Sequence, residues 1–456
     1  MIKESFRRYL EEAIGRENAL VAFSAFEEPA SVSVRLNPFK KIPVPNGEPV
    51  RWSPYGYVLP ERPVFTLDPC FHAGAYYVQD SSSMFVGDVF RQLLKEYELP
   101  EDRPLRVLDL CAAPGGKTTD LAASLRETMG DRFILVANEV MKQRAGILAG
   151  NVALWGDPNV VVTSDDPKAF ASFPGYFDII LADVPCSGEG MFRKDEEACS
   201  QWSEDNVALC EGRQRRIIAD VWPALADNGL LIYSTCTFNR YENDGNVRWI
   251  SESLGAEPVF RTPQSMYEGV IATELGFSLV PGFVKGEGQY CSAVRKSGAD
   301  VLKELRKSRN RPSREKADLV PGQLKKLFTV DVTFRQKGDT IIAVPAALVQ
   351  DIMSLVTGLN VIAAGCAAGS FKGKDFIPDA DLALSLIMDD NAFPRVPVDR
   401  TVALAFLHRD TIIVEDAPKG IVLICHEGLP LGFVKNLGNR CNNLYPQSRR
   451  IRMDIK

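Results

Sequence analysis

Short apolar runs alternate with amphipathic stretches through the middle of the chain. Apolar runs of four or five residues followed by turn-forming residues predict buried strands, and a spacing of three to four residues between apolar positions predicts helices. The predicted strands cover 106–110, 133–137, 160–163, 177–181 and 230–234, and the predicted helices cover 118–126, 141–154 and 206–225. Repeated strand–helix units at this spacing predict an α/β fold with a parallel, doubly wound sheet.

The two ends of the chain carry different patterns. Before the sheet, the pattern predicts a helix over 4–14, a strand over 30–36 and a helix ending near 97, capped by the polar residues of 79–83. After it, 296–321 is polar and basic, 323–378 predicts a small α/β unit, and 380–456 predicts short strands with glycine turns. The pattern therefore predicts five parts of the chain, namely an N-terminal domain over 1–88, a central α/β domain over 89–297, a basic linker over 298–321, a small α/β domain over 322–379 and a β-rich domain over 380–456.

Composition narrows the class of protein. A chain of 456 residues with 45% hydrophobic and 25% charged residues is typical of a globular protein of several domains. No apolar run reaches the length of a membrane span, and the first thirty residues mix Arg with Glu, so a cytoplasmic monomer is expected. The ten cysteines show no close pairing and the three histidines are isolated from one another, so neither a disulfide framework nor a metal site is expected.

Charge is distributed unevenly. The formal net charge of −6 argues against a broad nucleic-acid surface. However, residues 301–316 hold seven basic and two acidic side chains, and residues 435–456 hold six basic side chains and one acidic side chain. Basic patches on an acidic body suffice for RNA contact, although a solvated linker or face gives the same pattern.

The stretch from Arg106 to Thr119 predicts a cofactor-binding corner, with the sequence R-V-L-D-L-C-A-A-P-G-G-K-T-T. A strand, a turn of small residues and a helix start let backbone amides approach a ligand closely. A phosphate-binding Walker loop would need glycine at Cys111, and the dinucleotide fingerprint G-x-G-x-x-G is absent. An ordinary strand-to-helix turn is the remaining alternative.

Other strand ends carry acidic residues on the same predicted edge of the sheet. Glu139 follows the second strand, where a carboxylate can accept both hydroxyls of a ribose. Asp165 and Asp166 follow the third strand, where an adenine would lie, and the sequence does not decide between them.

A cysteine follows each of the last two strands, Cys186 in A-D-V-P-C-S-G-E-G-M-F-R-K and Cys236 in Y-S-T-C-T-F. A free cysteine is usually a small buried hydrophobe, but two at equivalent heights of neighbouring strands can touch one planar ligand. A thiolate that adds to carbon six of cytosine makes carbon five nucleophilic, and a second thiol can then assist release. Asp183 would stabilise the adduct by hydrogen bonding at N3 and the exocyclic amine.

These motifs, D-L-C-A-A-P-G-G-K-T, A-N-E, D-V-P-C-S-G-E-G-M-F-R-K and Y-S-T-C-T-F, closely resemble those of the NOL/NOP/Sun family of RNA (cytosine-5) methyltransferases. The resemblance implies a Rossmann-like class I methyltransferase sheet, with Cys236 as the nucleophile, Cys186 as the releasing cysteine, Asp183 orienting the base, and Lys117 beside them. It implies S-adenosylmethionine as cofactor, bound by Cys111, Ala112, Ala113, Pro114, Gly115, Gly116, Lys117, Glu139, Asp165, Asp166 and Asp183.

The motifs G-E-G-M-F-R-K, F-H-A-G-A-Y-Y-V-Q-D and L-P-L-G-F-V-K-N-L-G-N-R-C-N-N-L-Y-P resemble the bacterial RsmF (YebU-like) subgroup, which implies small-subunit (16S) ribosomal RNA as substrate. The resemblance also implies an RNA-binding-like N-terminal domain over 1–88, a methyltransferase domain over 89–297 and a PUA-like RNA-binding domain over 380–456, with the PUA-like motif at 420–452. Gly282 and Gln289 stand where the subgroup often has histidine. The expected RNA contacts are Arg193, Lys194, Lys435, Asn436, Arg440 and Arg449. The alternatives are a transfer RNA methyltransferase, a non-enzymatic RNA-binding assembly factor of the ribosome, and a nucleotide hydrolase using G-G-K-T.

Overall fold

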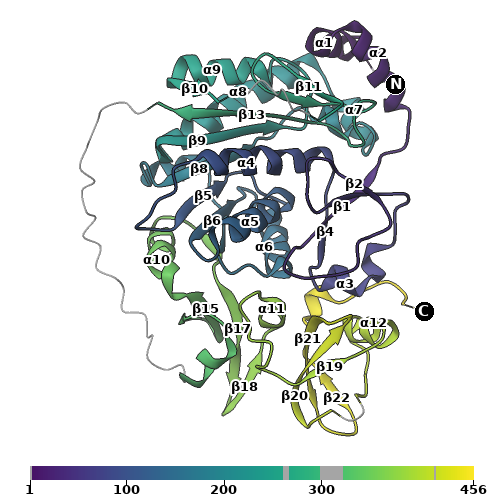
Figure 1. Ribbon diagram of the computed structural model, residues 1–456, viewed down its shortest axis with the longest axis vertical. Coiled ribbons are helices and arrows are strands. Elements are labelled where there is room, and N and C mark those ends of the chain that lie inside the picture. Colours follow the sequence, from purple (N-terminus) through teal and green to yellow (C-terminus); the bar gives the residue numbers. More distant parts are fainter. Residues whose placement is uncertain (1–2, 260–266, 298–321, 415–416, 456) are drawn as a thin grey trace.

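A computed structural model describes residues 3–259, 267–297, 322–414 and 417–455. The expected linker over 298–321 lies wholly outside these residues. The described residues form four sheets, and the largest of them lies in the upper half of the molecule in Figure 1, above the C-terminal sheets. Within the described residues, no helix is both long and apolar enough to cross a bilayer.

The central sheet is mixed, with strand order β11-β12-β13-β9-β8-β5-β6-β7-β16, and β10 also pairs with β13. Strands β9, β8, β5, β6 and β7 are mutually parallel, as predicted. Their bounds are β5 (Leu105–Asp109), β6 (Phe133–Asn138), β7 (Val160–Thr163), β8 (Phe177–Asp183) and β9 (Leu225–Thr235). The antiparallel strands are β10 (Ala256–Pro258), β11 (Val270–Ala272), β12 (Phe277–Leu279), β13 (Gln289–Lys296) and β16 (Val361–Ala363).

The parallel strands are apolar throughout because both faces of the sheet are covered. Along β6, Phe133 and Leu135 belong to the core on one face, and Ile134 and Val136 to the core on the other. The first core includes side chains of α4 (Phe85–Glu96), α5 (Gly116–Met129) and α6 (Lys142–Trp155). The second includes side chains of α8 (Glu204–Val221), α9 (Asp244–Leu254) and α10 (Val349–Gly358). The short α7 (Glu196–Gln201) precedes α8.

One predicted boundary is wrong. The helix expected over 206–225 ends at Val221, and β9 starts at Leu225 instead of 230. Pro223 explains the early end, because proline has no amide hydrogen to continue the helix. The other central elements lie within a few residues of their predicted positions.

The N-terminal sheet has the order β2-β3-β1-β4. Its strands are β1 (Val32–Leu36), β2 (Glu48–Pro49), β3 (Gly56–Leu59) and β4 (Tyr76–Val78), with helices α1 (Glu4–Ile14), α2 (Arg16–Phe26) and α3 (Pro69–His72) beside them. Arg35 of β1 is fully buried and bonds to Thr119 Oγ1 at 2.5 Å and to Gln79 Oε1 at 2.7 Å. This arginine fastens the N-terminal sheet to the first turn of α5.

The C-terminal part holds two sheets of the orders β14-β15-β17-β18 and β19-β20-β21-β22. Their elements are β14 (Val332–Lys337), β15 (Thr340–Pro345), β17 (Cys366–Lys372), β18 (Asp375–Pro378), α11 (Ala380–Leu384), β19 (Arg395–Pro397), α12 (Arg400–His408), β20 (Gly420–His426), β21 (Leu429–Asn436) and β22 (Cys441–Asn443). The separate small domain expected over 322–379 also contributes β16, which pairs antiparallel with β7. The C-terminal part is therefore continuous with the central sheet.

Candidate active site

The site lies at the carboxyl ends of β5, β8 and β9, where the order of the parallel strands reverses along the chain. A cavity of about 320 Å³ opens there. It is lined by Cys111, Ala112, Ala113, Pro114, Gly116 and Lys117 of the predicted corner, by Asp183 and Cys236, and by residues of the N-terminal domain and of the loop before β13.

The turn after β5 matches the predicted corner. Gly115 precedes α5 with φ of 113°, in a region that a residue with a Cβ rarely adopts. The carboxyl of Asp109 is buried beneath this turn and accepts the Thr118 hydroxyl at 2.6 Å. Burial raises the pKa of Asp109 to about 7.

The two cysteines that follow β8 and β9 meet. Asp183 and Ser234 are register partners on these strands, and Cys186 Sγ lies 3.1 Å from Cys236 Sγ. Cys236 lines the cavity. The hydrogen bond to Cys236, together with burial, raises the pKa of the Cys186 thiol well above its ordinary value. The Cys186 thiol therefore holds its proton firmly, and its S–H can donate to the sulfur of Cys236.

Asp183 is held from three sides. Its Oδ2 accepts Lys117 Nζ at 2.9 Å, and its Oδ1 accepts Ser234 Oγ at 2.6 Å and Gln289 Nε2 at 3.3 Å. Burial lowers the pKa of Lys117, but the carboxylate of Asp183 outweighs burial and the net change is upward. Lys117 is therefore a fixed cation that holds Asp183 and also attracts a thiolate at Cys236.

The loops that carry the two cysteines are joined by a pair of buried carboxylates. Glu189, in the Cys186 loop, accepts the amides of Phe238 and Asn239 beyond Cys236, at 2.6 and 3.1 Å. In return Glu242, which follows Cys236, accepts the amide of Ser187 at 3.0 Å. Burial raises the pKa of Glu242 to about 7. These reciprocal contacts, which we call the carboxylate clamp, fix the approach of the two sulfurs.

Gly190 completes the junction between the loops. Its amide donates to Cys236 O at 2.7 Å. A Cβ at this position would lie 2.8 Å from the same oxygen, closer than a side chain can pack. Glycine is required here by close approach of two backbones, and the sequence signal for it is the G-E-G of the Cys186 loop.

Replacing Glu189 by glutamine should lower the free energy of unfolding by about 2–3 kcal/mol, because the new amide group faces buried donors and leaves one of them unsatisfied. The expected result is a clear fall in the urea midpoint. The control is Glu268→Gln, which alters a side chain that is 87% exposed, and its free energy of unfolding should stay within about 0.5 kcal/mol of that of the wild type. Equal midpoints for the two variants would contradict the clamp.

Three acidic residues predicted to bind the cofactor do not line this cavity. Glu139 is buried, accepts the amide of Met141 at 2.9 Å and pairs with Arg144 at 3.1 Å. Asp165 accepts the amide of Asn360 at 2.9 Å. Asp166 is half exposed and accepts the amide of Lys168 at 3.0 Å. Their roles toward an adenosine therefore stay predictions.

Several predicted RNA contacts are engaged within the protein. Arg193 forms a two-pronged, largely buried ion pair with Glu287, both distances 2.8 Å, and its contact with a phosphate stays a prediction. Asn436 is buried and its Nδ2 donates to the carbonyl oxygens of Ala417 and Pro418, and Arg449 pairs with Asp381 of α11 at 2.6 Å. Their contacts with RNA stay predictions.

The remaining candidates keep some exposure. Lys194 lines the cavity and pairs with Asp80 at 3.1 Å, and Lys435 pairs with Asp375 at 3.1 Å. Arg440 is exposed. These three stay predictions.

The N-terminal domain contributes part of the cavity that the sequence did not reveal. Gln79, Asp80 and Ser83 line it, and Asp80 Oδ2 accepts the amide of Glu287 at 3.2 Å. Helix capping explains these polar residues only in part, because Asp80 caps the turn at Ser82 but no side chain caps α4. The run Q-D-S-S-S was the available signal.

Comparison with known proteins identifies the family of the chain. Residues 98–295 match the model of the 16S rRNA methyltransferase RsmB/F family, residues 2–81 the N-terminal domain of 16S rRNA methyltransferase RsmF, and residues 393–451 the methyltransferase RsmF PUA domain. The ribosomal RNA small subunit methyltransferase F of Enterobacter sp. (strain 638) is 31% identical over 82% of this chain and 77% of its own. The chain belongs to the RsmB/F family.

An RsmF-type relative from Escherichia coli O157:H7, also called ribosomal RNA small subunit methyltransferase F, is 28% identical over 93% of this chain and 91% of its own. Among solved structures, a methyltransferase homolog from Pyrococcus horikoshii is 25% identical with a TM-score of 0.51, over 63% of this chain and 93% of its own. NSun6 from the same organism, solved with SFG, has a TM-score of 0.53 at 18% identity, over 65% of this chain and 99% of its own, and supports the fold.

As a member of the RsmB/F family, the chain is a methyltransferase with S-adenosylmethionine as cofactor. The cavity fits this cofactor. Among the described residues, two buried polar atoms of its lining, Gln79 Nε2 and Asp109 Oδ1, have no hydrogen-bond partner, so the cavity offers a donor and an acceptor to a ligand. The nucleotide hydrolase alternative fits less well, because Lys117 is engaged by Asp183.

Proposed function

We propose that this RsmB/F family member transfers a methyl group to carbon five of a cytosine in 16S ribosomal RNA through a covalent bond from Cys236 to carbon six. The observation that carries the proposal is the pair of sulfurs 3.1 Å apart beside a carboxylate held by a lysine. A purely RNA-binding assembly factor would need neither the paired thiols nor the clamp that positions them. A ribosomal RNA substrate also implies a cytoplasmic enzyme.

The first step is addition of the thiolate. Cys236 Sγ forms a bond to carbon six of the ring, and the electron pair of the carbon five–carbon six double bond shifts so that carbon five becomes nucleophilic. Asp183 orients the ring at N3 and the exocyclic amine, and Lys117 keeps its carboxylate aimed. S-adenosylmethionine, when bound by the turn 111–117, supplies the methyl group that carbon five takes.

The second step is release. The proton on carbon five must leave, the carbon five–carbon six double bond re-forms, and the bond from carbon six to Cys236 Sγ breaks. Cys186 is the base nearest to that bond. Its pKa is held high chiefly by Cys236. Once Cys236 is a thioether, the negative charge and most of the hydrogen bond that held the proton are gone, so Cys186 loses its proton to water more readily in the adduct than in the free enzyme. The Cys186 thiolate then takes the proton from carbon five, and Cys236 leaves as a thiolate.

The test is methyl transfer to defined RNA. The purified protein, incubated with S-adenosylmethionine and transcripts of 16S ribosomal RNA or of transfer RNAs, should create a bisulfite-resistant cytosine in the 16S transcript alone. Transfer to transfer RNA would favour that alternative, and binding of S-adenosylmethionine and RNA without any transfer would favour an assembly factor. Binding of ATP in preference to S-adenosylmethionine would favour a hydrolase.

A further inference from the structure

A second cavity adjoins the catalytic one on the side of β4 and α6. Its volume is about 330 Å³, and we call it the flank cavity. Five aromatic residues and one arginine dominate its lining, namely Arg62, Phe65, Phe71, Tyr76, Tyr77 and Trp155. Neither the catalytic mechanism nor the cofactor uses it.

The flank cavity shares a wall with the catalytic cavity. Tyr77 and Val78 line both. The Tyr77 hydroxyl donates to Pro114 O at 3.0 Å, and Asn151 Nδ2 donates to the same oxygen at 2.8 Å. Tyr77 and Val78 thus form the shared wall, and Tyr77 braces the cofactor-binding turn from the side of the flank cavity. A chain of nucleotides whose cytosine enters the catalytic cavity has its neighbours within reach of the flank cavity.

The opposite side of the flank cavity leads to the PUA domain. The segment 65–72 provides Phe65 and Phe71, and within it Leu67 O accepts a hydrogen bond from Arg400 Nη2 at 2.9 Å. Helix α12 packs against α3 there, and in Figure 1 the C-terminal domain lies next to α3. The flank cavity therefore lies between the active site and the side of the N-terminal domain that contacts the C-terminal domain.

The chemistry of the lining suits a nucleotide. The rings of Phe65, Phe71 and Tyr76 form one cluster, with centroids 5.8 to 6.4 Å apart. Aromatic surfaces hold unpaired bases without regard to sequence, and arginine binds the phosphates that follow them. Arg62 is exposed, lies 5.6 Å over the Phe65 ring, and has no ion pair among the residues that the structure describes.

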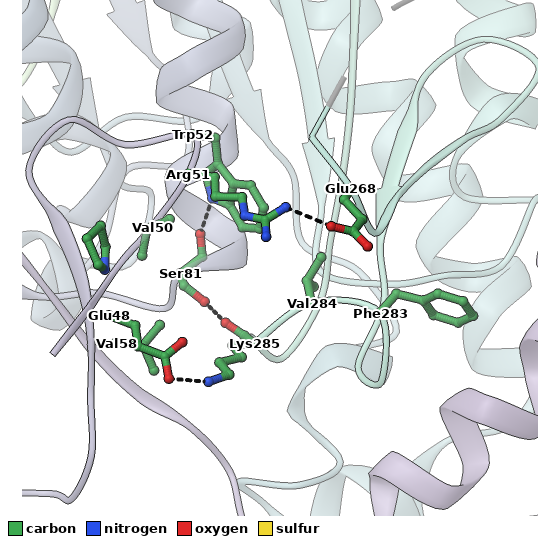
Figure 2. A pocket seen from close by; sticks show the side chains of 11 residues that line it. Glu48, Val50, Arg51, Trp52, Val58, Ser81, Glu268, Phe283, Val284 and Lys285 are labelled. Carbon is green, nitrogen blue, oxygen red and sulfur yellow. Dashed lines mark hydrogen bonds and ion pairs between the residues drawn. The ribbon is translucent and has the colours of Figure 1, made fainter. Parts of the chain in front are cut away.

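Another cavity of the N-terminal domain differs in that its cations form ion pairs (Figure 2). Its volume is about 280 Å³, and it also has cations, Arg51 and Lys285. Each is paired with a glutamate across the boundary between the N-terminal and catalytic domains, Arg51 with Glu268 at 3.1 Å and Lys285 with Glu48 at 2.6 Å. Figure 2 shows the two ion pairs on opposite sides of Ser81. These cations are neutralised, whereas Arg62 remains available to a phosphate.

We propose that the flank cavity binds one unpaired nucleotide of the substrate RNA, with its base on the aromatic cluster and its phosphate at Arg62. The proposal rests on the proposed function, because it takes RNA as the substrate. It assigns the N-terminal domain a direct part in holding RNA near the target cytosine.

The probe is a synthetic oligonucleotide spanning the cytosine that bisulfite mapping identifies, labelled for fluorescence anisotropy. Thr66→Trp fills the flank cavity from an exposed position, and Arg62→Ala removes its cation. We expect the Kd for the oligonucleotide to rise about tenfold in the first variant and about fivefold in the second. Arg51→Ala, the matched control in the cavity of Figure 2, should change it less than twofold, and the Kd for S-adenosylmethionine should stay unchanged throughout.

A scan with abasic nucleotides provides the decisive comparison. At one position other than the target, loss of the base should weaken binding to the wild type about tenfold and binding to Thr66→Trp hardly at all. If removal of the base weakened binding by the same factor in the wild type and in Thr66→Trp, the proposal would be overturned. So would unchanged binding in Arg62→Ala, a surface change that does not put folding at risk. Oligonucleotide binding that depends on the flank cavity without any methyl transfer would refute the proposed function and leave this inference standing.

Discussion

Replacement of Cys236 by alanine should lower the rate of methyl transfer on the order of 10⁴-fold, because no other group can add to carbon six from the same place. RNA that contains 5-azacytidine should form a denaturation-resistant complex with the wild type and none with Cys236→Ala. The measurements are incorporation of labelled methyl groups and a denaturing gel.

Cys199→Ala is the matched control for this experiment, since it removes a partly exposed thiol from outside the cavity and should leave both readouts unchanged. A covalent complex of undiminished yield in Cys236→Ala would refute its assignment as the nucleophile. Binding of S-adenosylmethionine should be retained, because the turn 111–117 is untouched.

Replacement of Cys186 by alanine should have the opposite effect on the covalent complex. Addition and methyl transfer remain available, but loss of the base slows release on the order of 10²-fold, so the adduct accumulates on ordinary RNA. A single-turnover experiment should show normal transfer of the first methyl group, followed by a stalled complex on a denaturing gel.

The double variant Cys186→Ala/Cys236→Ala tests whether the stalled complex uses the expected sulfur. It should form no complex at all. Turnover of Cys186→Ala at the wild-type rate would instead show that another group, such as a water molecule, takes the proton from carbon five.

Much of the fold could be predicted because the central strands are buried on both faces and therefore read as continuous apolar runs. Strand β7 matches its predicted bounds, and the meeting of Cys186 and Cys236 followed from their equal heights on neighbouring parallel strands. The prediction extended helix α8 too far because the apolar spacing of the sequence continues past Pro223 into β9.

The parts that escaped prediction depend on contacts between distant segments. A basic side chain after a catalytic motif usually faces solvent, and the sequence does not show that Arg193 pairs with Glu287, almost a hundred residues away. The clamp of Glu189 and Glu242 likewise requires knowing which loop faces which. A local pattern shows that a side chain is charged and leaves open which partner the fold will bring to it.

The pairing of β16 with β7 bears on how the enzyme can be dissected. Residues 361–363 cover the outer edge of β7, and Ser164 next to that edge donates its amide to Asn360 O at 3.0 Å. A chain cut before this strand would present an open, apolar β edge to its neighbours in solution, which is a known template for aggregation. Poor solubility of the shortened protein would therefore result from the loss of β16 from the edge of β7. Loss of activity in such a protein would say nothing about whether the PUA domain binds RNA.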